Sequence, residues 1–170
     1  MRIAKIEKDS LNNGPGVRAV VWCQGCSVKC KGCHNPETWN PSEGREFNLT
    51  DMTELVTYLQ QDYVSGLTIS GGNPLEPYTV DYLICMLSEI RKRCPDKTIW
   101  LYTGFDITYQ RLIEQNSASE CCRLCDVVID GPYVEELRSI TIPFRGSTNQ
   151  HVIDIQKSLK QKKIVLWEEQ

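Results

Sequence analysis

The 170-residue sequence lacks long hydrophobic runs and a strong excess of charge of either sign. No stretch approaches the ~18 apolar residues of a membrane-spanning helix, and residues 1–5 lack the apolar region of a signal peptide. Lys and Arg number 19 against 22 Asp and Glu, so the net charge of −3 gives no basic footprint for nucleic acid. We therefore expect a cytoplasmic protein that binds neither a membrane nor nucleic acid.

Histidine is scarce, with two copies, whereas cysteine is unusually frequent, with nine. A chain of this length buries a sizeable core without disulfide bonds, and clustered cysteines in a reducing compartment more often serve metal or redox chemistry. Two of the nine, Cys85 and Cys94, stand apart. The others form a first cluster of Cys23, Cys26, Cys30 and Cys33 and a second of Cys121, Cys122 and Cys125. The spacing within each cluster therefore indicates what it can bind.

Runs of β-branched and apolar residues alternate with segments of helical periodicity. Strands are expected over residues 17–22, 66–70, 98–102 and 126–129. Helices are expected over residues 78–93 and 107–115, and from Asp51, which would cap the first helix with Glu54 as its partner. This alternation predicts an α/β fold with a largely parallel sheet. We expect one domain of residues 1–156 and a charged C-terminal tail of residues 157–170.

The most specific motif is Cys-x3-Cys-x2-Cys, formed by Cys26, Cys30 and Cys33. Three thiolates on one short loop can bind three irons of a 4Fe–4S cluster, because soft sulfur ligands suit iron–sulfur clusters. The fourth iron then remains open for a substrate. Zinc is the alternative occupant, since Cys23 would supply the fourth ligand that a structural zinc site needs. A zinc-stabilised binding module is therefore an alternative function.

A second motif follows the expected strand at residues 66–70, where Gly71 and Gly72 lead into Asn73. Tandem glycines let the backbone approach a ligand closely, and ligands of parallel α/β sheets lie at the carboxyl ends of the strands. Taken alone, the two glycines are more typical of a plain turn between a strand and a helix. Together with the cysteine motif, they indicate a ligand-binding turn.

These motifs resemble the radical S-adenosylmethionine superfamily, and more closely the activating proteins of anaerobic ribonucleotide reductases. The similarity covers residues 13–150 in the order of that family. It rests on the blocks at residues 13–18, 25–26, 30–35, 38–39, 70–75, 100–104, 130–133 and 144–150. The alternative family is the activating enzymes of pyruvate formate-lyase. Those enzymes are longer, but they have a motif similar to residues 33–36.

The resemblance implies an incomplete (β/α) barrel of the radical S-adenosylmethionine type, an oxidoreductase with one 4Fe–4S cluster and S-adenosylmethionine as cofactors. An electron from the cluster would cleave S-adenosylmethionine reductively, and the resulting radical would take a hydrogen from a glycine of the partner. The implied partners are anaerobic ribonucleotide reductase and an electron donor such as flavodoxin or ferredoxin. The open side of such a barrel suits a protein substrate, and the polar residues 145–150 form either a surface turn or a wall of that site.

The resemblance also assigns contacts with S-adenosylmethionine. Gly71, Gly72 and Asn73 are expected against its methionine moiety, where a side chain at Gly72 would fill the space that the ligand needs. Asn73 stands where the superfamily commonly has a carboxylate, so its contact with the ammonium group of the ligand lacks charge assistance.

The last cysteine of the motif, Cys33, is flanked by Gly32 and His34, and the resemblance places all three beside S-adenosylmethionine. The second cysteine cluster has no counterpart in the family pattern. Its members are expected either as small buried hydrophobic residues or as a metal or redox site that lacks a local fourth ligand.

Overall fold

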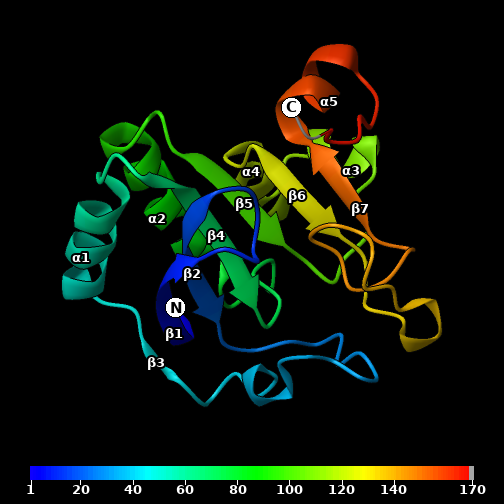
Figure 1. Ribbon diagram of the computed structural model, residues 1–170, viewed down its shortest axis with the longest axis horizontal. Coiled ribbons are helices and arrows are strands. Elements are labelled where there is room, and N and C mark those ends of the chain that lie inside the picture. Colours follow the sequence, from blue (N-terminus) through cyan, green and yellow to red (C-terminus); the bar gives the residue numbers. More distant parts are fainter. Residues whose placement is uncertain (169–170) are drawn as a thin grey trace.

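The structure is a computed structural model that describes residues 1–168. Within them the strands are β1 (Arg2–Ser10), β2 (Val17–Cys23), β3 (Arg45–Glu46), β4 (Val64–Gly71), β5 (Thr98–Tyr102), β6 (Val127–Asp130) and β7 (His151–Asp154). They form one sheet in the order β3-β1-β2-β4-β5-β6-β7 (Figure 1). Strands β2, β4, β5 and β6 are parallel, whereas β1, β3 and β7 pair antiparallel. The predicted α/β fold is confirmed, and the sheet stays open between β3 and β7.

One face of the sheet is covered by helices (Figure 1). The helices within residues 1–168 are α1 (Leu49–Leu59), α2 (Val80–Arg93), α3 (Tyr109–Ile113), α4 (Ser117–Arg123) and α5 (Ile155–Gln161), with 3-10 helices η1 (Pro36–Thr38) and η2 (Glu135–Leu137). Buried side chains of α1, α2 and α4 pack with alternate residues of the parallel strands in the main core. None of these helices is long and apolar enough to cross a membrane.

The sequence patterns located the parallel strands and missed the outer elements. The four predicted strands agree with β2, β4, β5 and β6 to within two residues. Strand β1 escaped notice because most of its residues are partly or fully exposed and give no clear alternation, and β7 has only four residues. The expected third helix shortens to α3, and α4 follows it unpredicted. Helix α5 runs through residue 157, where the tail was expected to begin.

The cap of α1 differs from the sequence-based expectation. Asn48 is the capping residue, because its Oδ1 accepts from the backbone N–H groups of Thr50 and Asp51 at 2.9 and 3.1 Å. Asp51 Oδ2 accepts in return from the backbone N–H of Asn48 at 2.9 Å. The prediction that Asp51 caps the helix with Glu54 was therefore wrong. Asp51 is instead the partner carboxylate of a capping box that begins three residues earlier.

The second face of the sheet carries an aromatic cluster centred on Trp100. Trp100 is 1 % exposed and contacts Phe144 and Trp167 edge-on, at centroid distances of 5.1 and 5.0 Å. Trp167 belongs to the segment predicted as a tail, and its backbone N–H donates to the carbonyl of Val152 at 2.8 Å. The segment after α5 therefore packs against the sheet beside the loop that carries Phe144.

Arg18 of β2 is buried on the same face and forms no ion pair with any described residue. Its Nε donates to Thr68 Oγ1 at 2.7 Å, and Nη2 donates to the carbonyl of Leu67 at 2.7 Å. The guanidinium lies over the Trp100 ring at 5.5 Å, and burial lowers the pKa of Arg18 to about 10. Thr68 Oγ1 donates in turn to the carbonyl of Asn13 at 2.6 Å, so this cluster fixes the turn before β2.

We expect Arg18→Ala to lower the free energy of unfolding by about 3 kcal/mol, because it leaves several buried acceptors without a donor. The control is Arg45→Ala, which removes a half-exposed arginine paired with Asp51 at 2.6 Å and should cost about 1 kcal/mol or less. Urea denaturation followed by circular dichroism measures both losses. Equal losses in the two variants would contradict a structural role for Arg18.

Candidate active site

The carboxyl ends of β2, β4, β5 and β6 lie at one edge of the sheet, because these strands are parallel neighbours. The loops that follow them surround a pocket of about 510 Å³. Residues 24–46, here called the cysteine loop, follow β2, and residues 71–76, here called the Gly-Gly turn, end β4. Thr103 and Gly104 follow β5, and Gly131 follows β6; all three line the pocket. Ligands of parallel α/β sheets are bound at this edge.

Cys26, Cys30 and Cys33 all line this pocket and are partly exposed. Burial raises the pKa of the Cys30 thiol; a hydrogen bond from the Tyr133 backbone lowers it, and the neighbouring Cys26 and Cys33 raise it. Cys26 and Cys33 therefore lie close enough to Cys30 to influence its thiol. Cys23, in contrast, is fully buried outside the pocket lining, and burial raises the pKa of its thiol to about 12.

This donor set fits a 4Fe–4S cluster better than a single ion. Among residues 1–168, no three His, Cys, Asp or Glu side chains converge so that they could hold one metal ion. The thiolates of a 4Fe–4S cluster bind different irons, so they surround a cubane instead of meeting at a point. A zinc site would need Cys23 as its fourth ligand, and burial makes that thiol hard to ionise.

Three residues of the pocket lining carry a buried side-chain donor without a hydrogen-bond partner in the described part of the chain. Trp22 Nε1, Trp39 Nε1 and Arg145 Nε are buried and have no hydrogen-bond partner within residues 1–168, and all three residues line the pocket. Buried polar groups are almost always hydrogen-bonded in native proteins. These three donors are exceptions in the pocket wall, and their burial means that they are not exposed to the pocket itself.

The family comparisons agree with this chemistry. The family model described as "4Fe-4S single cluster domain" matches residues 12–153. Three relatives carry the name "Anaerobic ribonucleoside-triphosphate reductase-activating protein". The relative from Enterobacteria phage T4 is 38% identical over 140 residues, which are 82% of this chain and 85% of the relative. The relative from Escherichia coli (strain K12) is 34% identical over 143 residues, 82% of this chain and 90% of the relative. The relative from Haemophilus influenzae is 35% identical over 140 residues, 81% of this chain and 88% of the relative.

The chain belongs to this family of reductase-activating proteins. Among solved structures, QueE from Escherichia coli aligns with a TM-score of 0.45 and 17% identity, over 61% of this chain and 52% of that one.

Four of the six residues expected at S-adenosylmethionine from the likeness to the activating proteins line the pocket, namely Cys33, His34, Gly71 and Gly72. Gly32 and Asn73 do not. Asn73 is 0% exposed, and its amide is already engaged, because Oδ1 accepts from Thr103 Oγ1 at 2.9 Å and Nδ2 donates to Glu76 Oε1 at 3.2 Å. This geometry therefore does not favour the expected contact between Asn73 and an ammonium group.

A side chain at Gly72 was expected to fill the space of the ligand, but in the structure it would point toward the protein backbone. A Cβ atom there would meet the carbonyl oxygen of Gly25 and would lie 3.0 Å from that of Thr38. Both carbonyls belong to the cysteine loop, so the missing side chain makes room for that loop. Gly71 has a φ of 100° and a Cβ there would lie 2.6 Å from the Cys23 carbonyl, which also requires glycine.

The sequence reasoning missed several pocket residues that lie on strands and loops outside the two motifs. Trp22 and Tyr102 end predicted strands, and Tyr133 packs against His34 with a centroid distance of 5.6 Å. Trp22 and Tyr102 could have been found from the sequence, because each stands at the carboxyl end of a predicted strand. Arg145 lines the pocket, so residues 145–150 contribute to its wall, one of the two alternatives expected for them.

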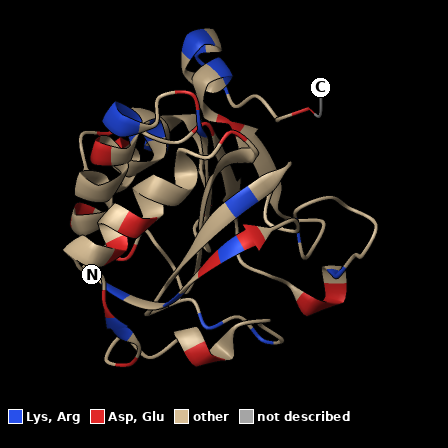
Figure 2. Cartoon of the chain, turned by 60° about the vertical axis from the view of Figure 1, so that its left-hand side comes forward, with Lys and Arg blue, Asp and Glu red and all other residues tan. Residues whose placement is uncertain are grey.

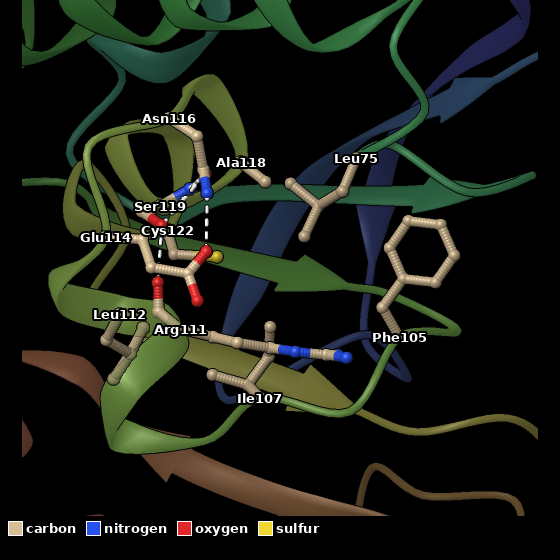
Figure 3. A pocket seen from close by; sticks show the side chains of 10 residues that line it. All are labelled: Leu75, Phe105, Ile107, Arg111, Leu112, Glu114, Asn116, Ala118, Ser119 and Cys122. Carbon is tan, nitrogen blue, oxygen red and sulfur yellow. Dashed lines mark hydrogen bonds between the residues drawn. The ribbon is translucent and has the colours of Figure 1, made fainter.

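The second cysteine cluster lies in the core beside another pocket, of about 340 Å³ (Figure 3). Cys121, Cys122 and Cys125 are at most 1% exposed. The pKa of Cys125 is raised mainly by its hydrogen bond with Cys121 and by burial, and burial raises that of Cys122. Figure 3 shows Cys122 beside the polar side chains of Ser119 and Glu114, with Leu75 across the same pocket. The placement favours the role of small buried hydrophobic residues.

We expect Gly72→Ala to reduce cluster loading and stability together, because the methyl group meets the backbone of the cysteine loop. Gly146→Ala is the control within the same pocket lining, since the atoms nearest to a Cβ there belong to the side chains of Tyr133, at 3.0 Å, and Gln150, and not to backbone. Iron and sulfide per chain after anaerobic reconstitution, with the thermal midpoint of the cluster-free protein, measure the two effects. Full loading and an unchanged midpoint in Gly72→Ala would contradict this packing.

Proposed function

We propose that this protein activates an anaerobic ribonucleoside-triphosphate reductase by generating a glycyl radical on it. The observation that carries the proposal is the position of Cys26, Cys30 and Cys33 around one pocket at the carboxyl ends of the parallel strands. In the proposed reaction a 4Fe–4S cluster, when bound, supplies the electron for reductive cleavage of S-adenosylmethionine. The names of the relatives support the choice of the reductase as the partner.

In this proposal the three thiolates hold the cluster, and the rest of the pocket holds S-adenosylmethionine. Trp22, Trp39 and Arg145 line the pocket and would contact it. Cys33, His34, Gly71 and Gly72 would lie beside it. The remaining expected residues, Gly32 and Asn73, would support the wall from behind, since Gly32 abuts Tyr133 and Asn73 binds Thr103.

An open pocket supports a protein substrate. The side of the pocket formed by residues 131–150 contains little regular structure, with the 3-10 helix η2 inside it. Acidic and basic residues are interspersed along the whole chain (Figure 2), and the net charge is small. We propose that the glycine loop of the reductase enters from this side, that flavodoxin or ferredoxin delivers the electron, and that the protein works in the cytoplasm without binding nucleic acid or membrane.

Replacing Cys26, Cys30 or Cys33 with Ala is expected to abolish the cluster, whereas Cys23→Ala keeps it, because Cys23 lies outside the pocket. Anaerobic reconstitution followed by iron, sulfide and zinc analysis measures the outcome. Cys85→Ala, which removes an exposed thiol elsewhere, is a further control. A zinc-loaded wild type, or loss of the metal in Cys23→Ala together with its retention in Cys30→Ala, would contradict the assignment.

The reduced protein, mixed with S-adenosylmethionine and its cognate reductase, is expected to produce the doublet of a glycyl radical in an electron paramagnetic resonance spectrum. The doublet should disappear when the radical-bearing glycine of the reductase is changed to Ala, and when Cys30→Ala replaces the wild type. If 5′-deoxyadenosine forms but an intact reductase shows no doublet, the proposed activation is wrong.

A further inference from the structure

Glu76 is a buried carboxylate between the cysteine loop and the Gly-Gly turn. It is 4% exposed, and its Oε1 accepts three hydrogen bonds. They come from the backbone N–H of Ser27 at 2.8 Å, from Ser27 Oγ at 2.6 Å and from Asn73 Nδ2 at 3.2 Å. Glu76 does not line the pocket, so any effect it has on the pocket passes through these neighbours.

The hydrogen bonds continue from Glu76 to the next strand. Asn73 Oδ1 accepts from Thr103 Oγ1 at 2.9 Å, and Thr103 Oγ1 accepts from the backbone N–H of Phe105 at 3.1 Å. The backbone N–H of Asn73 also donates to the carbonyl of Gly25 at 2.8 Å. Ser27, Glu76, Asn73 and Thr103 therefore form one network that joins the loops after β2, β4 and β5.

The cysteine loop needs such support because it has little packing of its own. No residue from 26 to 37 is buried, and Lys29 adopts a positive φ of 48°. Hydrophobic burial therefore cannot fix the position of this segment. Ser27 follows Cys26 directly, and hydrogen bonds to a carboxylate are roughly twice as strong as those between neutral groups. Two of them at Ser27 restrain the first cysteine of the motif.

We propose that Glu76 is a positioning residue that holds Cys26 in place through Ser27, and that its negative charge lowers the reduction potential of the cluster bound there. This inference rests on the proposed function, since it needs a cluster at Cys26, Cys30 and Cys33. Net charge and hydrogen bonding near a cluster set its potential. A fixed negative charge behind the loop disfavours the added electron, so its removal raises the potential.

Two substitutions separate position from charge. Glu76→Gln keeps an acceptor oxygen for Ser27 and Asn73 but removes the charge, so it should load a normal cluster with a more positive midpoint potential. Glu76→Ala removes both, so it should lose at least half of the iron and sulfide per chain. Glu37→Gln is the matched control, because it removes one exposed charge from the same loop, and it should leave loading unchanged and shift the potential less than Glu76→Gln. A redox titration followed by electron paramagnetic resonance, without S-adenosylmethionine, gives the potentials.

A second measurement tests the positioning without any cluster. In the cluster-free protein, amide hydrogen exchange at Ser27 should become at least tenfold faster in Glu76→Ala and stay close to wild type in Glu37→Gln. Unchanged exchange and full loading in Glu76→Ala would overturn the positioning role, and equal potentials in wild type and Glu76→Gln would overturn the electrostatic one. A wild type that binds no cluster would overturn the proposed function instead, while the exchange rates would still decide the positioning role.

Discussion

Hydrogen bonds from the carboxyl ends of the parallel strands hold the cysteine loop, and the remainder of the candidate site depends on them. The backbone N–H of Asn73, which follows β4, donates to the carbonyl of Gly25 at 2.8 Å, and within the loop the backbone N–H of Gly25 donates to the carbonyl of Thr38 at 2.7 Å. Such contacts require glycine at positions 71 and 72, because a side chain there would occupy the space of the facing backbone. The Gly-Gly turn thus positions the cysteine loop, and both of its glycines also line the pocket.

The two faces of the sheet contribute differently to the structure. The helix-covered face supplies the main apolar core, which burial stabilises. The opposite face carries Arg18, Trp100 and the loop with Phe144, and the pocket opens above it. A buried guanidinium with neutral acceptors and an aromatic ring as neighbours costs desolvation, which its many hydrogen bonds offset. This cluster fixes the turn before β2 and includes Phe144, which lines the same pocket as the three thiols.

The sequence was informative where the signal is local. The spacing of Cys26, Cys30 and Cys33 and the strand ending at Gly71 could be interpreted without knowledge of the fold. The orientation of Asn73 could not, because its partner Thr103 lies 30 residues away, and Ser27 and Glu76 are 49 residues apart. Such pairs depend on which strands are neighbours, and one sequence does not specify that register. Strand β7 could not be predicted for the same reason. Its four residues carry too little pattern, and its position depends on antiparallel pairing with β6.

The partial exposure of the three motif cysteines has a consequence for the protein in air. Thiols that solvent can reach are open to oxygen and peroxide, and the first oxidation products of such thiols are sulfenic acids and disulfides. Cys23 and the second cysteine cluster are shielded by burial, so oxidation reaches the pocket cysteines and the exposed Cys85 and spares the core. An oxidised molecule would then keep its core while losing the three thiols proposed to hold the cluster. Such a molecule is a target for thiol reduction and reassembly, and its fold needs no rebuilding.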